Sequence, residues 1–426
     1  MKYLLLVKNA AQVVTVCAQG ERMKRGAEMN EVAVVSDGSI VVNNDGLIEA
    51  VGPSKEISSA YKEEDFETVV DAAGMSVIPG FVDGHTHPVW AGDRVHEFAM
   101  KLAGASYMDI HKVGGGIGYT VSCTRDSSED DLLHSLLQRL RRMLKSGTTT
   151  VEAKSGYGLE ADTEIKMLRV LHRAQAAQEV DIVSTFCGAH SVPKGSTAAQ
   201  AADDVINVQL PALKAATERG EISPANIDVF LEKGVFELED TRRILKAGQA
   251  CGLKLNYHGD ELSYQHAGEL AGELKALAVS HLEHVSEEGM KAMAAVPTVA
   301  VLLPTTAYVL RIAPPPARKL IENGVPVALG SDFNPNAHCM SMPFVMNLAC
   351  VLMHMTLNEA LVAATINSAA SLGLEDKCGS LEAGKQADMV LVGASRWEHV
   401  AYQLVDPPIA IVCKKGRIVV DNRGAA

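Results

Sequence analysis

Two histidines separated by one residue, His85 and His87, stand at the end of an apolar run typical of a β-strand. Side chains at positions i and i+2 of a strand point to the same side, so two imidazoles with this spacing can bind one cation from a single rigid element. Two histidines in an exposed turn would have the same spacing, and an isolated pair is more often of that kind. The residues further along the chain decide between these interpretations.

Further histidines and acidic residues stand where later apolar segments end. His258 and Asp332 both occupy such positions, and with the first pair they supply nitrogen and oxygen ligands from three segments. A hydrolytic Zn²⁺ or Fe²⁺ site needs three or four such ligands and one open position for water. Taken singly, His258 or Asp332 is better explained as a capping or hydrogen-bonded polar residue. Together they predict one divalent metal per chain, Zn or Fe, with His85, His87, His258 and Asp332 as its ligands.

Eight apolar segments alternate with amphipathic helical stretches in the middle of the chain, and they must position these ligands. The segments are Val77–Val82, Thr148–Glu152, Ile182–Phe186, Ile227–Leu231, Leu253–Tyr257, Ala276–Ser280, Thr298–Leu303 and Val325–Gly330. Eight strand-helix units over about 300 residues predict an α/β fold, a (β/α)₈ barrel of the TIM type. Active-site groups of such barrels lie at the carboxyl ends of the strands, which is where the histidines and acidic residues occur.

The two ends of the chain have a different character, with short strands and turns. Neither end has enough strands to close a sheet of its own, so we expect residues 1–77 and 383–426 to pair into one small composite β-sandwich domain. Residues 78–382 then form the barrel domain. The connection from Trp90 to about Arg125 is rich in glycine, and it is either a mobile lid over the site or a plain surface insertion.

Composition limits the partners. The formal net charge is -13, whereas a surface for nucleic acid or an anionic membrane needs clustered Lys and Arg. We therefore expect a small-molecule substrate, with no nucleic-acid and no membrane partner. No apolar run reaches transmembrane length, the first residues are too short for a signal peptide, and the eight cysteines lack C-x-x-C spacing. A cytoplasmic location with reduced thiols is expected.

The chain resembles the amidohydrolase superfamily of metal-dependent barrel hydrolases. The resemblance covers essentially the whole chain and rests on Pro79–His87, His258, His281, Gly330–Asp332 and Gly379–Asp388. Among its members the chain is most similar to those that open 4-imidazolone-5-propanoate to N-formimidoyl-L-glutamate in histidine degradation. That closer similarity is carried by the segments His87–Arg94, Lys154–Leu159, Gly188–Pro193, His258–Glu261 and Gly330–Asn336.

The resemblance implies how the substrate is bound. A substrate with a propionate needs an anchor, and Arg94 can form a bidentate pair with it while Tyr157 donates a hydroxyl. From composition alone, a surface ion pair of Arg94 with Asp93 or Glu97 is an equally good explanation. Contact with the ring or the developing oxyanion is expected from His190, which could instead be a core histidine. Asn334, Asn336 and the backbone at Ala337 are expected to hold the opened product.

The resemblance also implies the chemistry, which is hydrolysis of a cyclic amide by a metal-activated water. His281 stabilises the oxyanion, and Glu261 or Asp332 passes the proton to the departing ring nitrogen. His281 could instead be a core histidine, and Glu261 could be a carboxylate at a helix N-terminus. Dinuclear members bridge two metals with a carbamylated lysine, but the setting of Lys154 resembles the mononuclear pattern.

Two other functions compete with this one. A cytosine- or guanine-type nucleobase deaminase of the same superfamily uses a similar set of residues, but its substrate has no propionate for Arg94 to bind. A non-catalytic scaffold, like relatives of the dihydropyrimidinases, would have lost metal ligands, whereas all the expected ligands are present here. The resemblance further suggests a homodimer.

Overall fold

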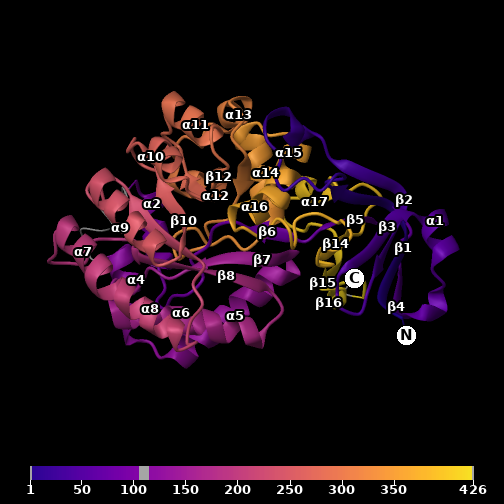
Figure 1. Cartoon of the computed structure of the whole chain (residues 1–426), viewed down its shortest axis with the longest axis horizontal. Helices are drawn as coiled ribbons and strands as arrows, with labels where there is room; N and C mark the ends of the chain where they lie inside the picture. The colour runs from indigo at the N-terminus through magenta and orange to yellow at the C-terminus, as the bar shows by residue number, and fades with distance from the viewer. Residues whose placement is uncertain (1, 105–114, 425–426) are drawn as a thin grey trace.

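The computed structural model describes residues 2–104 and 115–424. It has two parts, a barrel built from the middle of the chain and a sheet in which the indigo N-terminal and yellow C-terminal segments lie together (Figure 1). The centre of the predicted lid, residues 105–114, lies outside the described residues. On either side of it the chain forms helices α2 (Val95–Leu102) and α4 (Ile117–Asp126).

The barrel consists of parallel strands that pair in chain order. They are β6 (Phe81–Asp83), β7 (Thr148–Lys154), β8 (Asp181–Ala189), β9 (Asn226–Leu231), β10 (Lys254–Gly259), β11 (Ala278–His281), β12 (Val299–Leu302) and β13 (Val327–Leu329). Backbone hydrogen bonds just beyond β6 and β13 complete the closure, because the Asp332 N–H donates to His85 O (3.0 Å) and the His87 N–H to Phe333 O (2.9 Å). The predicted (β/α)₈ barrel is confirmed.

Helices follow the strands and cover the outside of the barrel (Figure 1). They are α5 (Glu129–Lys145), α6 (Ala161–Ala177), α7 (Ala198–Asp204), α8 (Leu210–Glu218), α9 (Leu238–Ala250), α10 (Ala267–Leu274), α11 (Glu287–Ala294), α12 (Pro304–Leu310), α13 (Ala317–Glu322), α14 (Met342–Met353), α15 (Leu357–Ala363) and α16 (Ile366–Ser371).

Helix α5 shows how the sequence specifies these elements. Ser128 caps the first turn of the helix by accepting a hydrogen bond from the Asp131 N–H. The acidic residues of this turn stabilise the helix, because their negative charges lie near the positive end of the helix dipole. Leu132, Leu136 and Leu140 recur every four residues and are buried. This apolar stripe packs the helix onto the barrel, as its spacing predicts.

The terminal segments form one mostly antiparallel sheet in the order β16-β15-β14-β5-β1-β2-β3, with β4 beside β1. Its strands are β1 (Tyr3–Val16), β2 (Ala33–Val42), β3 (Ile48–Pro53), β4 (Phe66–Asp71), β5 (Ser76–Pro79), β14 (Met389–Val392), β15 (Ile409–Lys414) and β16 (Arg417–Asp421). Short helices α1 (Ser54–Ala60) and α17 (His399–Tyr402) accompany it. Leu5 and Ile40 share one core with Met389 and Ile411, so strands from the two ends of the chain pack together in one sheet, as the sequence predicts.

The predicted barrel strand Val77–Val82 is wrong in extent, because the chain changes sheets at Gly80. Residues before it form β5, which pairs with β14, and residues after it form β6 of the barrel. A Cβ atom on Gly80 would lie 2.3 Å from Thr149 Oγ1, so only glycine allows this close crossing. The apolar run is continuous across both strands, and its pattern does not reveal the change of partner.

All eight cysteines lie within the described residues and are free thiols. Among the helices of the described residues, none is long and apolar enough to cross a membrane.

Candidate active site

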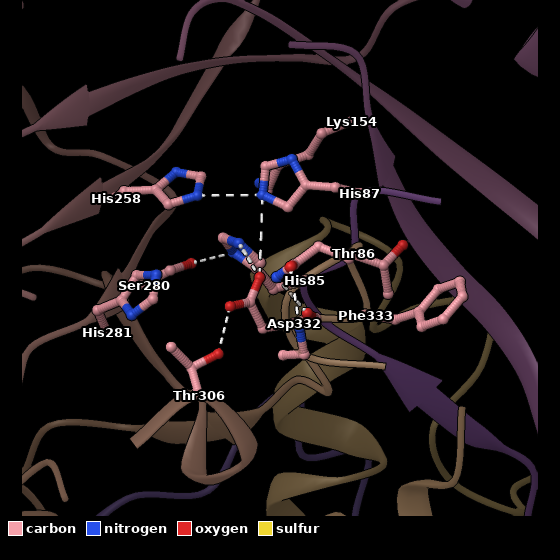
Figure 2. Close-up of polar contacts among 12 residues, drawn as sticks. His85, Thr86, His87, Lys154, His258, Ser280, His281, Thr306, Asp332 and Phe333 are labelled. Carbon is pink, nitrogen blue, oxygen red and sulfur yellow. Dashed lines mark hydrogen bonds and ion pairs between the residues drawn. The ribbon is translucent and has the colours of Figure 1, made fainter. Parts of the chain in front are cut away.

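The predicted metal ligands converge at the carboxyl ends of the barrel strands (Figure 2). His87 Nε2 lies 3.1 Å from His258 Nε2. Asp332 Oδ1 lies 3.5 Å from His85 Nε2 and 3.9 Å from His87 Nε2. Side chains from the first, fifth and eighth barrel strands therefore meet around one point, as the spacing of the motifs predicts.

The seam that closes the barrel holds these ligands in register. Asp83, at the end of β6, accepts hydrogen bonds from the Ser331 N–H (2.8 Å) and the Ser331 hydroxyl (2.5 Å). His85 and Asp332 follow directly on the two strands, and the Asp332 N–H donates to His85 O. Asp332 has a φ of 46°, an uncommon conformation for a residue other than glycine, which turns its carboxylate toward the histidines.

The donor atoms fit one divalent cation. Burial lowers the pKa of His85, His87 and His258 well below the usual value, so all three imidazoles are neutral and offer a lone pair. His85 Nδ1 lies 2.8 Å from Ser280 Oγ, and the His258 Nδ1–H donates to Asp228 Oδ1 at 2.7 Å. Both rings thus turn Nε2 toward the centre, where His85 Nε2 is buried with no hydrogen-bond partner among the residues that the structure describes. Three neutral nitrogens and a carboxylate oxygen are a donor set suited to Zn²⁺ or Fe²⁺.

Lys154 is held as an ammonium next to Asp228, the carboxylate that binds the ring of His258. Its Nζ lies 2.5 Å from Glu152 Oε1 and 2.6 Å from Asp228 Oδ2, and all three side chains are fully buried. Burial by itself would lower the pKa of Lys154, but the carboxylates of Asp228 and Glu152 outweigh it and raise that pKa. A carbamate forms from a neutral amine, so this environment disfavours a carbamylated bridging ligand.

A small cavity, open to solvent, lies beside the cluster. Its walls include all of the sequence-predicted site residues except His85 and Ala337. The walls are formed by His87, Arg94, Ile117, Tyr157, His190, Phe230, His258, Glu261, Leu262, His281, Thr306, Leu310, Asp332, Asn334 and Asn336. The N–H of Ala337 donates to Asn334 Oδ1 (3.0 Å), so the structure gives Ala337 a supporting position behind Asn334.

Arg94 lies in the wall of this cavity and its side chain is only 4% exposed. Glu97 binds one edge of the guanidinium, with Oε2 at 2.9 Å from Nε and 2.7 Å from Nη2. The other carboxylate oxygen of Glu97 accepts a hydrogen bond from the Gly116 N–H (2.7 Å). The ion pair with Glu97 considered from the sequence therefore exists, but it is buried beside the cavity and not on the surface.

His281 and Glu261 form a second titratable pair in the wall. Glu261 Oε2 lies 3.6 Å from His281 Nε2, and Glu283 Oε1 lies 3.7 Å from the other ring nitrogen. Burial opposes the charged form of His281, but the two carboxylates outweigh it and raise the pKa of His281 to about 10. Burial raises the pKa of Glu261 to about 8. The pair can therefore present a positively charged donor and a carboxyl group that carries a proton near neutral pH.

His190 is neutral and its tautomer is set by the backbone. Burial lowers the pKa of His190 to about 4. Its Nδ1–H donates to Gly156 O at 3.0 Å, so Nε2 carries the lone pair. This nitrogen can accept a hydrogen bond from a ring N–H but cannot donate to an oxyanion. Of the two roles that the sequence leaves open for His190, the geometry favours ring contact.

Several residues of the site were not predicted. Asp228 and Ser280 lie within hydrogen-bond distance of the predicted ligands His258 and His85, the Thr306 hydroxyl donates to Asp332 Oδ2, and Phe230 lines the cavity. Asp228 could have been found from the sequence, because its carboxylate interrupts the otherwise apolar segment Ile227–Leu231. Threonine, serine and phenylalanine are common at the ends of strands, so the sequence does not single out Thr306, Ser280 or Phe230.

Comparison with known proteins agrees with this geometry. A family model described as the amidohydrolase family matches residues 76–419. The chain is 61% identical over 421 residues to a probable imidazolonepropionase of Dictyostelium discoideum, with 99% of each chain covered. It is 56% identical over 417 residues to a probable imidazolonepropionase of Homo sapiens, covering 97% of this chain and 98% of the human one. The chain belongs to the imidazolonepropionase family of amidohydrolases.

Solved structures of more distant proteins share the fold of this amidohydrolase. An adenosine deaminase from Xanthomonas campestris with bound zinc superposes with a TM-score of 0.73 at 18% identity, covering 99% of this chain and 94% of that chain. Guanine deaminase of E. coli superposes with a TM-score of 0.70 at 16% identity, covering 99% of this chain and all of the other. At such identities the likeness concerns the fold alone, and the amidohydrolase barrel with its terminal sheet is common to all three.

Proposed function

We propose that this protein hydrolyses the cyclic amide of 4-imidazolone-5-propanoate to N-formimidoyl-L-glutamate. The observation that carries the proposal is the buried guanidinium of Arg94 in the wall of the same cavity as the neutral histidine cluster. A buried cation beside a hydrolytic site suits a small substrate that carries a carboxylate. The imidazolonepropionase names of the full-length relatives support the same substrate.

We assign one divalent ion per chain, Zn²⁺ or Fe²⁺, to His85, His87, His258 and Asp332. When bound, such an ion supplies a Lewis acid and lowers the pKa of a bound water toward 7. Ser280 and Asp228 hold the rings of His85 and His258 so that Nε2 of each faces the centre. The remaining steps depend on side chains of the cavity.

Arg94 and Tyr157 bind the propionate and so fix the position of the ring. Because Glu97 occupies the Nε and Nη2 edge of the guanidinium, the substrate carboxylate approaches from the other side. His190 accepts a hydrogen bond from a ring N–H through its unprotonated Nε2. Asn334 and Asn336 also line the cavity and hold the opened product, with Ala337 supporting Asn334.

The charges of the cavity match the course of the hydrolysis. Water adds to the ring carbonyl carbon, and negative charge develops on the carbonyl oxygen, where the imidazolium of His281 donates a hydrogen bond. The ring C–N bond then breaks, and the departing nitrogen takes a proton from Glu261, for which Asp332 is the alternative carrier. The products are a carboxylate and the formimidoyl nitrogen of N-formimidoyl-L-glutamate.

We further propose that the protein is a cytoplasmic homodimer that acts on this small molecule and binds neither nucleic acid nor membrane. Light scattering of the purified full chain measures the oligomeric state directly. A single species at the mass of one chain would contradict the dimer without affecting the proposed reaction.

Turnover of freshly generated imidazolonepropionate by metal-loaded protein tests the proposed reaction, followed by the loss of ultraviolet absorbance and by detection of N-formimidoyl-L-glutamate. Cytosine and guanine serve as comparison substrates for the deaminase alternative. Rapid turnover of the imidazolonepropionate alone is the expected result. Ammonia release from a nucleobase, with no loss of imidazolonepropionate, would favour the deaminase. A protein that binds no metal and turns over none of these substrates would favour the scaffold.

A further inference from the structure

A chain of buried charged groups runs from β7 to β9 and ends on a metal-ligand histidine. Lys154 and Glu152 lie on β7 and Asp228 lies on β9, and each side chain is fully buried. The proposed reaction uses none of the three. Burying an ammonium and two carboxylates is strongly unfavourable unless the charges are paired in well-arranged contacts. Such a group inside a barrel therefore calls for an explanation.

Asp228 makes contacts through both of its carboxylate oxygens. Oδ1 accepts hydrogen bonds from the Nδ1–H of His258 at 2.7 Å and from the backbone N–H of His258 at 3.1 Å. Oδ2 faces Lys154 Nζ at 2.6 Å. The lysine thus holds the carboxylate from one side while the histidine takes its other oxygen, and the carboxylate cannot turn without losing one of these contacts.

The lysine is itself held by a second carboxylate. Its Nζ lies 2.5 Å from Glu152 Oε1, which also accepts a hydrogen bond from the Thr185 hydroxyl at 2.6 Å. The Asn226 amide in turn donates to Thr185 Oγ1 at 3.2 Å. These contacts span three neighbouring strands and fix Lys154 to the rigid barrel wall.

We propose that Asp228 and Lys154 are positioning residues for the metal centre. Asp228 keeps the proton of His258 on Nδ1 and fixes the ring, so that the Nε2 lone pair points at the cation. Lys154 holds Asp228 as a correctly oriented carboxylate. A carboxylate on the far nitrogen of a ligand histidine increases its basicity and restricts its rotation, and loss of such a partner weakens metal binding. This inference rests on the proposed function only in assuming that the histidine cluster holds a divalent metal.

A second buried lysine provides a matched control. Lys414, at the end of β15, is also paired with two carboxylates, Asp388 at 2.5 Å and Asp181 at 2.8 Å. Asp181 begins β8, so this cluster joins the terminal sheet to the end of the barrel opposite the site. Its removal also takes a buried ammonium away from two carboxylates, but neither of these carboxylates touches a predicted metal ligand.

Metal affinity of the purified full-length protein tests the proposal, using Zn²⁺ alone as the probe and competition with a chelator of known affinity. The variants are Asp228→Asn, Lys154→Met, the double variant and Lys414→Met. We expect the dissociation constant for Zn²⁺ to rise roughly 10- to 100-fold in each of the first two. Because Asp228 and Lys154 act through the same contact, the double variant should bind Zn²⁺ with nearly the same affinity as the single variant that binds it less tightly.

A structural role alone gives a different pattern. Thermal unfolding midpoints of all four variants report the structural cost, and Lys414→Met should lower the midpoint while binding Zn²⁺ like the wild type. Proton-nitrogen correlation spectra of the His258 ring in metal-free Asp228→Asn should show loss of the single Nδ1–H tautomer. Wild-type Zn²⁺ affinity in Asp228→Asn overturns the proposal, and wild-type affinity in Lys154→Met overturns the part assigned to the lysine.

These results can be distinguished from failure of the proposed reaction. The binding assay needs no substrate, so a protein that binds Zn²⁺ and does not open imidazolonepropionate would refute the function and leave this test intact. Asp228→Asn keeps the size and one acceptor of the native residue. If Lys154→Met fails to fold while Lys414→Met folds, the Zn²⁺ affinity and ring spectrum of Asp228→Asn decide the proposal.

Discussion

Replacing Arg94 by methionine should weaken substrate binding more than it slows the chemical step. Arg94 is buried in the cavity wall and lies away from the histidine cluster's ligand set, so its proposed contact with the propionate exists in both the bound substrate and the transition state. A hydrogen bond to a charged group contributes about 1.5–3 kcal/mol. At about 1.4 kcal/mol for each factor of ten, KM should rise roughly 10- to 100-fold. The value of kcat should change much less.

The assay is steady-state hydrolysis of imidazolonepropionate with Arg94→Met, Arg94→Lys and Glu97→Gln. Lysine keeps the positive charge but lacks the planar fork that matches a carboxylate, so its KM should lie between those of the wild type and Arg94→Met. Glu97→Gln keeps an acceptor for the Gly116 N–H and removes the charge that orients the guanidinium, so a smaller rise is expected. Bound metal should be equal in all of these proteins.

An unchanged KM in Arg94→Met would refute the reasoning. It would mean that the guanidinium does not contact the substrate and that the buried pair with Glu97 is purely structural. Loss of bound metal in this variant would also count against the argument, because the fall in activity would then arise at the histidine cluster. Equal affinity of the wild type and Arg94→Met for a substrate analogue without the propionate would support the assigned contact.

Three further predictions concern the metal, the proton and the barrel seam. Removal of the metal by a chelator should abolish turnover and lower the unfolding temperature, since a ligand at 1,000 times its Kd stabilises the native state by about 4 kcal/mol; turnover that survives complete chelation would contradict the metal assignment. Glu261→Gln should lower kcat roughly 10²- to 10⁴-fold with no loss of metal, because the carboxyl donates a proton and is not a ligand. Glu261 can donate a proton only in its protonated form, and burial raises its pKa to about 8. The value of kcat/KM should therefore fall as the pH rises through about 8. An increase of kcat/KM over this range would mean that Glu261 acts as a base. Asp83→Ala should destabilise the fold by about 1–3 kcal/mol for each buried Ser331 donor left unpaired, measured by urea unfolding, and a change below about 0.5 kcal/mol would show that the seam does not need it.

Much of the fold follows from local patterns in the sequence. The apolar stripe and cap of α5 predict that helix, and the alternation of strands and helices predicts the barrel. The change of sheet at Gly80 does not follow from the pattern, because both sides of the glycine are equally apolar. Only the pairing of β5 with β14, from the other end of the chain, shows where the barrel begins.

The division of the chain into residues 1–77 with 383–426 and residues 78–382 stays a proposal. Its N-terminal limit falls within β5, which lies in the terminal sheet up to Pro79. Limited proteolysis of the native protein would locate the exposed connections between the two parts. Cleavage close to Gly80 is not expected, because the chain there is buried against Thr149.

The chemical types in the site were readable from the sequence, since metal ligands and acid-base residues are few and stand at the ends of predicted strands. The protonation states of these residues could not be predicted from the sequence. His281 and His190 are both histidines at strand ends, yet two carboxylates raise the pKa of His281 to about 10, while burial lowers that of His190 to about 4. Such differences depend on neighbours from other strands.

By itself the sequence determined a barrel hydrolase with His85, His87, His258 and Asp332 as its candidate ligands, because strand periodicity and ligand chemistry are local properties. The tertiary structure decided which side chains support them. Asp228 and Lys154 are 74 residues apart and meet only because β7 and β9 curve around the same barrel interior. Distances across the barrel, and the burial that follows from closing it, set the tautomers and charges on which the site depends.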